Sequence, residues 1–382
     1  MLTVALTLAS ATVEAHDPSA YGGLFRSRDL GETWLNADVG LLLNATLTVA
    51  VDPGDSNHLL MGTDIGLLRS SNGGRNWAPE AMDRIVGAVF ALNFSPDGRS
   101  AVAAAPSGVF RFEDGHWANA AAPTAAAPAR AIATTAAGRI YLLGQSELFV
   151  SDDGGQSFSR IPAMLPEGSE ITALTVAARP REVLLAVVDG APMASEDGGS
   201  QWRRRADGLG NAPIDTVVSD PEVPDRVWAA GADRIYISDD LGVAWRQVGQ
   251  ALPEPGTSVR GIAADPAATT LVVTTARGMY RSADGGSTWA LTEGNLPVHL
   301  EAGPLVRDPG EPRTLYAAYS LMPYAEVWRT ALEGSNLLAR TDPISLAGGL
   351  AFVLLLLILG TLLVRWLARR RTAGAASGGA SP

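Results

Sequence analysis

An eight-residue pattern, S-x-D-x-G-x-T-W, recurs along the chain and constrains the fold more than any other feature. Intact copies start 43 or 44 residues apart, and the two steps across one worn, shortened copy total 81 residues. This period suits the four-stranded blade of a β-propeller. The copies lie at residues 27–34, 70–77, 112–117 (the worn one), 151–158, 195–202, 238–245 and 282–289.

Each residue type in the pattern suits a self-contained turn, which we call the box hairpin. The Asp or Asn side chain can accept hydrogen bonds from N–H groups of its own turn, and the Gly can adopt a positive φ. The Trp offers a large apolar surface to pack between blades. The residues predicted to have these structural roles are Ser27, Asp29, Gly31, Trp34, Ser70, Asn72, Gly74, Trp77, Asp114, Trp117, Ser151, Asp153, Gly155, Phe158, Ser195, Asp197, Gly199, Trp202, Ser238, Asp240, Gly242, Trp245, Ser282, Asp284, Gly286 and Trp289.

The number of strand pairs predicts an all-β, seven-bladed propeller of four-stranded antiparallel blades. Alternating apolar runs divided by Pro, Asp and Gly turns indicate seven such pairs, the last at 304–306 and 314–319. The last pair has no box hairpin after it, and the first box hairpin has no clear pair before it. We therefore expect these two parts to complete one blade and leave no open sheet edge. Residues 326–330 (EVWRT) resemble the third strand of an eighth blade, so eight blades remain an alternative.

The apolar segment 344–364 carries no charge in 21 residues. As a helix rising ~1.5 Å per residue it would span ~30 Å, the thickness of the hydrocarbon core of a bilayer. Trp366 and arginines at 365 and 369–371 follow it, and this positive flank predicts a cytoplasmic C-terminus. We therefore expect a single-pass protein of the cell membrane, with the propeller outside, a linker at 336–343 and a basic, disordered cytoplasmic tail at 365–382.

Residues 1–15 allow two interpretations. They hold a short apolar run, and Val13-Glu14-Ala15 places small residues where a signal peptidase cleaves, but a basic n-region is missing. The segment is either a truncated signal peptide or a first strand. Because the expected ring closure needs no strand there, we predict a truncated signal peptide at 1–15 and a propeller domain at 16–335.

The box hairpins resemble the BNR/Asp-box repeats of bacterial sialidases, sortilin-type receptors, two-propeller xyloglucanases and the photosystem II assembly factors of chloroplasts and cyanobacteria. The resemblance covers about residues 21–335. It implies a propeller whose box hairpins lie on the rim away from the ligand face, so their Asp residues are expected to be structural. It implies architecture rather than a particular activity.

Signatures of catalysis and metal binding are mostly missing. Sialidases carry an Arg-Ile-Pro segment before the first box, whereas Arg160-Ile161-Pro162 follows the fourth, so no arginine can be assigned to a substrate triad. Two carboxylates would suffice for a glycosidase, and among 40 acids the repeat singles out no pair. The chain has no cysteine and only four widely spaced histidines, so we expect neither a metal nor a cofactor.

Charge limits the partners. The part before the apolar segment has a net charge of −15, which disfavours nucleic acid. The run Arg203-Arg204-Arg205 is most simply a solvated outer strand, and it is also a weak candidate for docking a partner.

The sequence therefore predicts a non-catalytic, membrane-anchored binding or assembly module. Its protein or glycan ligand should lie opposite the box hairpins, where the longer links at 35–46, 161–170, 206–214, 248–258 and 291–302 gather. A surface glycoside hydrolase or carbohydrate-binding propeller is the alternative, and a photosystem-type assembly factor is a third hypothesis.

Overall fold

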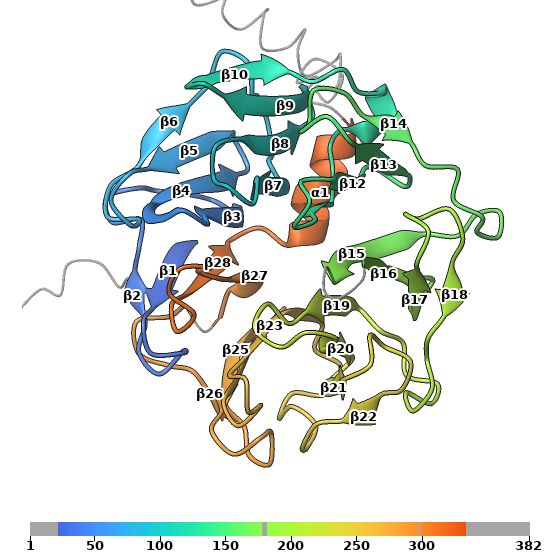
Figure 1. Cartoon of the computed structure of the whole chain (residues 1–382). Helices are drawn as coiled ribbons and strands as arrows, with labels where there is room; N and C mark the ends of the chain where they lie inside the picture. Colours follow the sequence, from blue (N-terminus) through green and yellow to red (C-terminus); the bar gives the residue numbers. More distant parts are fainter. Residues whose placement is uncertain (1–21, 178–181, 298, 334–382) are drawn as a thin grey trace, which may run out of the picture. The chain divides into compact units, whose positions relative to one another are not determined.

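The computed structural model describes residues 22–177, 182–297 and 299–333. Within these ranges the chain forms seven four-stranded antiparallel sheets, arranged as blades around one axis and followed by a helix, α1 (Tyr324–Glu333) (Figure 1). The seven-bladed, all-β prediction is confirmed. The predicted signal peptide (1–15), apolar segment (344–364) and basic tail (365–382) lie outside the described residues.

Six blades consist of four consecutive strands, which follow one another from the axis outward. Blade 1 contains β3 (Thr46–Asp52), β4 (Asp55–Thr63), β5 (Leu67–Ser70) and β6 (Ala78–Glu80). Blade 2 contains β7 (Ala91–Phe94), β8 (Ala101–Ala105), β9 (Gly108–Glu113) and β10 (His116–Asn119). Blade 3 contains β11 (Ala131–Thr134), β12 (Ile140–Leu143), β13 (Leu148–Ser151) and β14 (Ser159–Arg160).

The same order continues through the second half of the ring. Blade 4 contains β15 (Ile171–Ala177), β16 (Val183–Val188), β17 (Ala191–Ser195) and β18 (Arg203–Arg204). Blade 5 contains β19 (Thr216–Ser219), β20 (Val227–Gly231), β21 (Arg234–Ser238) and β22 (Arg246–Gln247). Blade 6 contains β23 (Val259–Ala264), β24 (Leu271–Thr275), β25 (Gly278–Ser282) and β26 (Ala290–Leu291).

Blade 7 closes the ring with strands from both ends of the described chain. Its order is β2 (Leu35–Asn36), β1 (Gly23–Ser27), β28 (Leu315–Ser320) and β27 (Glu301–Arg307). The strands β1 and β28 pair antiparallel along their length, with Gly23 opposite Tyr319 and Ser27 opposite Leu315. The predicted closure is therefore confirmed.

Residues 326–330, which resemble the third strand of an eighth blade, are helical and belong to α1. Val327, Trp328 and Ala331 are buried, while Glu326 and Leu332 are exposed. The spacing of the buried residues matches one side of a helix, whereas a strand would bury alternate residues. The alternative of an eighth blade is therefore wrong for the described residues.

The apolar core lies between neighbouring blades. The second strands are buried on both faces, as in β16, where all six residues are buried, because each blade is covered by the next on either side. One cluster, for example, joins Leu185 and Val187 of blade 4 to Val217, Ala229 and Tyr236 of blade 5. Each interface stacks two sheets face to face, and this packing fixes the relative positions of the blades.

The box hairpins connect the third and fourth strands and satisfy their own polar groups. In the hairpin of blade 6, the Ser282 hydroxyl accepts the Gly286 N–H at 2.8 Å and donates to Asp284 at 2.7 Å. Asp284 also accepts the Thr288 N–H at 2.8 Å and the Thr288 hydroxyl at 2.7 Å. The Thr288 and Ser282 bonds lower the pKa of Asp284 to about 2, so this carboxylate is already engaged by its own turn.

The worn copy in blade 2 replaces this network with a shorter turn. Glu113 lies opposite His116, so only Asp114 and Gly115 form the loop, with φ values of 51° and 81°. Two consecutive positive φ values are typical of the tight turns that match the twist of a hairpin. The blade therefore keeps its geometry without the serine–aspartate pair.

In blades 2, 4, 6 and 7, an arginine binds the box hairpin of the following blade. The carbonyl of the fourth hairpin residue is the acceptor each time: Arg111 donates to Gly154 at 2.7 Å and Arg205 to Leu241 at 2.6 Å. Arg26 likewise donates to Gly73, and Arg281 to Leu30 at 3.3 Å. At the worn hairpin, the Arg69 guanidinium instead lies 4.4 Å above the Phe112 ring. We call these contacts the arginine links.

Removing an arginine link should weaken the ring. Arg111→Met leaves the Gly154 carbonyl without this donor, and we expect the free energy of unfolding to fall by about 1–3 kcal/mol. Urea denaturation of the full chain, followed by tryptophan fluorescence, measures the change. Arg99→Met is the control because Arg99 is 87% exposed, and it should change stability by less than about 0.5 kcal/mol. Equal effects of the two substitutions would contradict a structural role for the link.

Candidate functional site at the inner rim of the loop face

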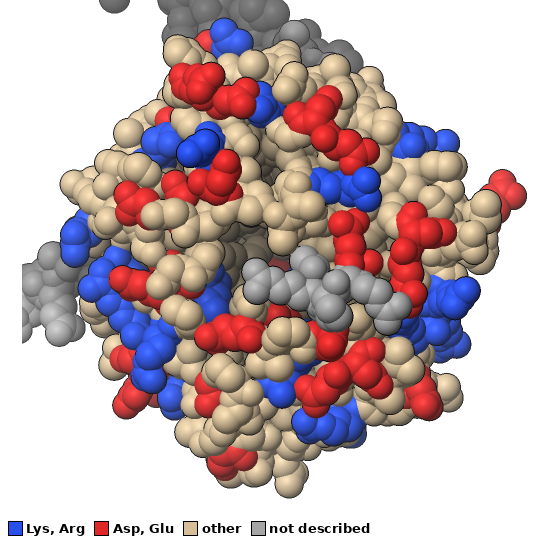
Figure 2. All heavy atoms as spheres, in the orientation of Figure 1, with Lys and Arg blue, Asp and Glu red and all other residues tan. Residues whose placement is uncertain are grey.

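The strand order gives the ring two faces. Successive strands are antiparallel, so the first-to-second and third-to-fourth connections lie on one side, which we call the box face. The second-to-third connections and the links to the next blade lie on the other side, the loop face. Figure 2 shows one face of the ring, with acidic and basic side chains interspersed around a hollow near its centre.

The innermost strands of successive blades contact one another around the axis. Six residues, each directly before the start of one of these strands or among its first two positions, form what we call the inner rim of the loop face. They are Phe90, Arg130, Glu170, Asp215, Arg260 and Glu301, one from each of blades 2 to 7.

Helix α1 lies over part of this rim (Figure 1). Its buried side packs on Ala45 and Ala88, which precede the innermost strands of blades 1 and 2. The Phe90 ring makes edge-to-face contacts with Tyr324 and Trp328, with centroids 4.9 and 5.0 Å apart. The helix is therefore anchored to blades 1 and 2 by aromatic packing.

Two ion pairs hold the helix from opposite sides. Arg130 pairs with Glu170 at 2.9 Å, joining blades 3 and 4, and its guanidinium lies 4.6 Å from the Trp328 ring centre. Arg260 pairs with Glu301 at 2.6 Å, joining blades 6 and 7, and lies 5.8 Å from the Tyr324 ring centre. Each arginine thus combines a carboxylate partner with an aromatic face.

Glu301 also fixes the start of the helix. Its second carboxylate oxygen accepts the Tyr324 N–H at 2.9 Å, which satisfies one of the free donors at a helix N-terminus. Burial raises the pKa of the Tyr324 hydroxyl to about 12, against the opposing charges of Arg130 and Arg260. Both arginines are therefore near this tyrosine.

The inner rim beyond α1 is acidic and accessible. Glu170, Thr172 and Asp215 of blades 4 and 5 are exposed. Desolvation raises the pKa of the Asp215 carboxyl above its usual range, and Arg260 opposes the shift. This part of the rim offers the Asp215 carboxylate and the Thr172 hydroxyl to a ligand, while the Glu170 carboxylate is paired with Arg130.

The predicted site residues occupy two kinds of position. The box residues lie in the connections between third and fourth strands, away from the inner rim. Arg203 and Arg204 are exposed on β18, the outermost strand of blade 4, whereas Arg205 is mostly buried and forms an arginine link. The structure therefore separates Arg205 from the other two and gives it a structural contact.

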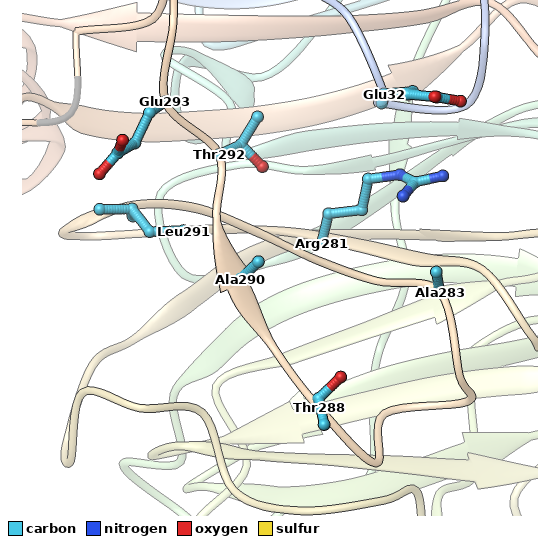
Figure 3. A pocket seen from close by; sticks show the side chains of 9 residues that line it. Glu32, Arg281, Ala283, Thr288, Ala290, Leu291, Thr292 and Glu293 are labelled. Atoms are coloured by element: carbon cyan, nitrogen blue, oxygen red, sulfur yellow. The ribbon is translucent and has the colours of Figure 1, made fainter.

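A groove of about 360 Å³ lies between blades 6 and 7 near two box hairpins (Figure 3). Glu32, Arg281, Thr288, Thr292 and Glu293 contribute polar groups to its lining. Arg281 already donates to the Leu30 carbonyl there. Within the described ranges, no group of three or more His, Asp or Glu residues is arranged to hold a metal ion.

Comparison with solved structures identifies propellers of the same architecture. YCF48 bound to D1 peptide matches with a TM-score of 0.55 and 17% identity, over 74% of this chain and 94% of that one. YCF48 from Cyanidioschyzon merolae matches with a TM-score of 0.58 and 16% identity, over 73% and 97%. The GH74 xyloglucanase from Xanthomonas campestris matches with a TM-score of 0.53 and 19% identity, over 72% of this chain and 53% of its own length.

This chain shares their fold. At these identities the likeness establishes the architecture and not the activity. No protein-family model and no curated protein sequence matches the chain. The resemblance to the BNR/Asp-box repeats agrees with the fold of these neighbours.

Sequence reasoning located the loop face but missed α1 and the inner rim. The innermost strands begin with unremarkable residues, and Arg130 and Glu170 are 40 positions apart. The only available signal was a charged residue near the start of five successive inner strands. The spacing of apolar residues in 324–333 would have indicated the helix.

Asp38 beside the loop face should make stability depend on pH. It is 2% exposed, accepts the Leu24 N–H at 3.0 Å, and burial raises its pKa to about 6. Above pH 6 the buried carboxylate is ionised and destabilises the fold. Below pH 6 it becomes protonated, and this destabilisation disappears. As the pH falls from about 7.5 to 4.5, the free energy of unfolding should rise by about 2 kcal/mol relative to Asp38→Asn. Urea unfolding across this pH range measures the free energy of unfolding of both proteins. If its dependence on pH were the same for the unsubstituted chain and Asp38→Asn, the raised pKa of Asp38 would be contradicted.

The packing of α1 can be tested by limited proteolysis. Trp328→Ala removes the ring that contacts Phe90 and Arg130 and should cost about 3–5 kcal/mol of packing free energy. Trypsin should then cleave after Arg329 much faster than in the unsubstituted chain, as followed by mass spectrometry. Leu332→Ala changes an exposed residue of the same helix and should leave the rate unchanged. Equal cleavage of both variants would show that the Trp328 contacts do not hold the helix.

Proposed function

We propose that this protein is a non-catalytic binding and assembly module that holds a segment of a partner protein at the inner rim of the loop face. The observation that carries the proposal is the rim itself. Two interblade ion pairs and an aromatic helix form a fixed surface beside the exposed Thr172 and Asp215. Variable connections on a rigid scaffold are the usual place for recognition.

The chemistry of the rim favours a ligand with a basic side chain. Asp215 and Thr172 are exposed, whereas Arg130 and Arg260 are already paired with Glu170 and Glu301. A sialidase-type site would instead need several arginines free to bind a substrate carboxylate.

A peptide ligand also agrees with one structural neighbour, which is described as bound to a D1 peptide. The proposal includes the tether expected from the sequence. Segment 344–364 anchors the protein in the cell membrane, with the propeller outside and residues 365–382 in the cytoplasm. Within the described residues, no helix is long and apolar enough to cross a membrane, and the proposed anchor falls outside them.

The proposal predicts that charge reversal at the open rim abolishes partner binding. The double variant Thr172→Arg, Asp215→Arg changes two residues of the open rim, and a circular dichroism spectrum equal to that of the unsubstituted protein confirms that the ring still folds. After mild detergent extraction of the full chain, quantitative mass spectrometry should show at least one co-purifying membrane protein reduced by about tenfold, the loss of a typical binding hot spot.

The matched control carries the same change in charge elsewhere. Ser71→Arg, Glu32→Arg alters exposed residues of two box hairpins and should retain the partner. Identical sets of co-purifying proteins from both variants would contradict the proposed site. Release of sugars from sialylated glycans or xyloglucan by the unsubstituted protein, lost in the rim variant, would replace the proposal with a glycoside hydrolase.

A further inference from the structure

Six exposed apolar side chains gather on the loop face of blades 7, 1 and 2, and we call them the apolar loop patch. They are Val39, Leu42, Ile65, Met82, Val86 and Leu321, and their exposed fractions range from 41% to 80%. Each lies in a link between blades or in the connection that follows a second strand. The strand order therefore brings them to the same face, beside α1.

Hydrogen bonds fix these loops relative to one another. The Leu321 N–H donates to the Asn44 carbonyl at 2.8 Å, and the Asp64 N–H donates to the Ala45 carbonyl at 3.3 Å. The Val86 N–H is held by the Ser107 hydroxyl at 3.0 Å. The loop backbones are therefore anchored while their apolar side chains face water.

The distribution of exposed apolar residues is uneven. Of the eleven large hydrophobic side chains exposed in the described ranges, six belong to this patch. Leu35, Val243 and Leu291 lie singly on outer strands or box hairpins. Single exposed aliphatic residues are ordinary, whereas a group on adjacent loops indicates a surface that another phase or molecule covers.

We propose that the apolar loop patch rests on the lipid bilayer, with its side chains in the boundary between headgroups and acyl chains. This inference depends on the membrane tether of the proposed function. Helix α1 packs on the loop face and ends at Glu333, and the apolar segment begins at Ile344, after ten intervening residues. Ten residues reach at most about 35 Å, so the tether keeps the loop face close to the membrane.

The composition of the patch favours lipid over a protein surface. Its members are aliphatic residues and one methionine, without the Trp, Tyr and Arg that dominate protein–protein hot spots. Aliphatic side chains at loop tips can enter the outer ~5–10 Å of a bilayer. The acidic body, with a net charge of −15, matches a zwitterionic surface better than an anionic one. Asp64 beside the patch agrees with this preference, while Asp83 is paired with Arg84 at 3.4 Å.

Site-specific fluorescence on the full chain tests the inference, because the protein has no cysteine of its own. Leu42→Cys and Ile65→Cys are each labelled with a polarity-sensitive fluorophore and reconstituted at low density into phosphatidylcholine vesicles. Val243→Cys is the matched control, since Val243 is 53% exposed in the box hairpin of blade 5. Lipids carrying a shallow nitroxide quencher are then compared with unlabelled lipids.

The expected result is a blue shift and several-fold stronger quenching by nitroxide lipid at positions 42 and 65 than at position 243. Introducing Met82→Asp and Val86→Asp should reduce that quenching. Equal quenching at all three positions in protein that floats with the vesicles would overturn the inference and leave the tether intact. Failure of the chain to float with vesicles would overturn the tether and the inference together.

Two other occupants give distinct results. A blue shift at positions 42 and 65 that grows with protein density, without quenching by nitroxide lipid, would assign the patch to a second copy of the chain. A blue shift that appears only when membrane proteins are added would assign the patch to a protein partner. Either outcome would overturn the bilayer as the occupant.

Discussion

The pairing of β1 with β28 is the constraint on which the other interfaces depend. A propeller blade buries its apolar faces only between two neighbours, so an open ring would expose one blade face and a strand edge at each end. Five residue pairs, from Gly23 opposite Tyr319 to Ser27 opposite Leu315, remove this exposure. They join residues almost 300 positions apart, and they fix the ring circumference at seven blades.

Polar contacts at the outer rim add to the apolar packing between blades. The box hairpins present carbonyls that arginines of the preceding blade bind. Tryptophan indoles act similarly, since Trp245 donates to the Arg205 carbonyl and Trp289 to the Gln250 carbonyl. The residues that define the repeat therefore hold the scaffold rigid, and this rigidity gives the loops on the other face fixed positions.

The loop face combines two surfaces of different chemistry. Over blades 4 and 5 the inner rim is acidic and accessible, whereas over blades 7, 1 and 2 the loops expose aliphatic side chains. Helix α1 lies between them and is held by Phe90 and by ion pairs that join blades 3 to 4 and 6 to 7. A module with this arrangement could meet a membrane with one part of its face and a protein segment emerging from that membrane with the other.

The sequence by itself determined the blade count, the closure of the ring and the assignment of box residues to hairpins. These features are local or periodic: a serine, an aspartate and a glycine within five residues define a turn, and a fixed period counts blades. It also indicated which face carries the variable loops, because that follows from strand order. The sequence left residues 326–330 open as a strand of an eighth blade, because five residues alone do not show the wider helical spacing of Val327, Trp328 and Ala331.

Only the tertiary structure decided the composition of the inner rim, the arginine links and the apolar loop patch. Arg130 and Arg260 lie 130 positions apart, yet both are near Tyr324, and Arg205 belongs to a link while its neighbours Arg203 and Arg204 face solvent. Ring closure brings residues of different blades together around the axis. Which residues meet there depends on the order of the blades and not on their separation along the chain. The physical reason is that periodic local interactions specify each blade, whereas the site is made where different blades meet.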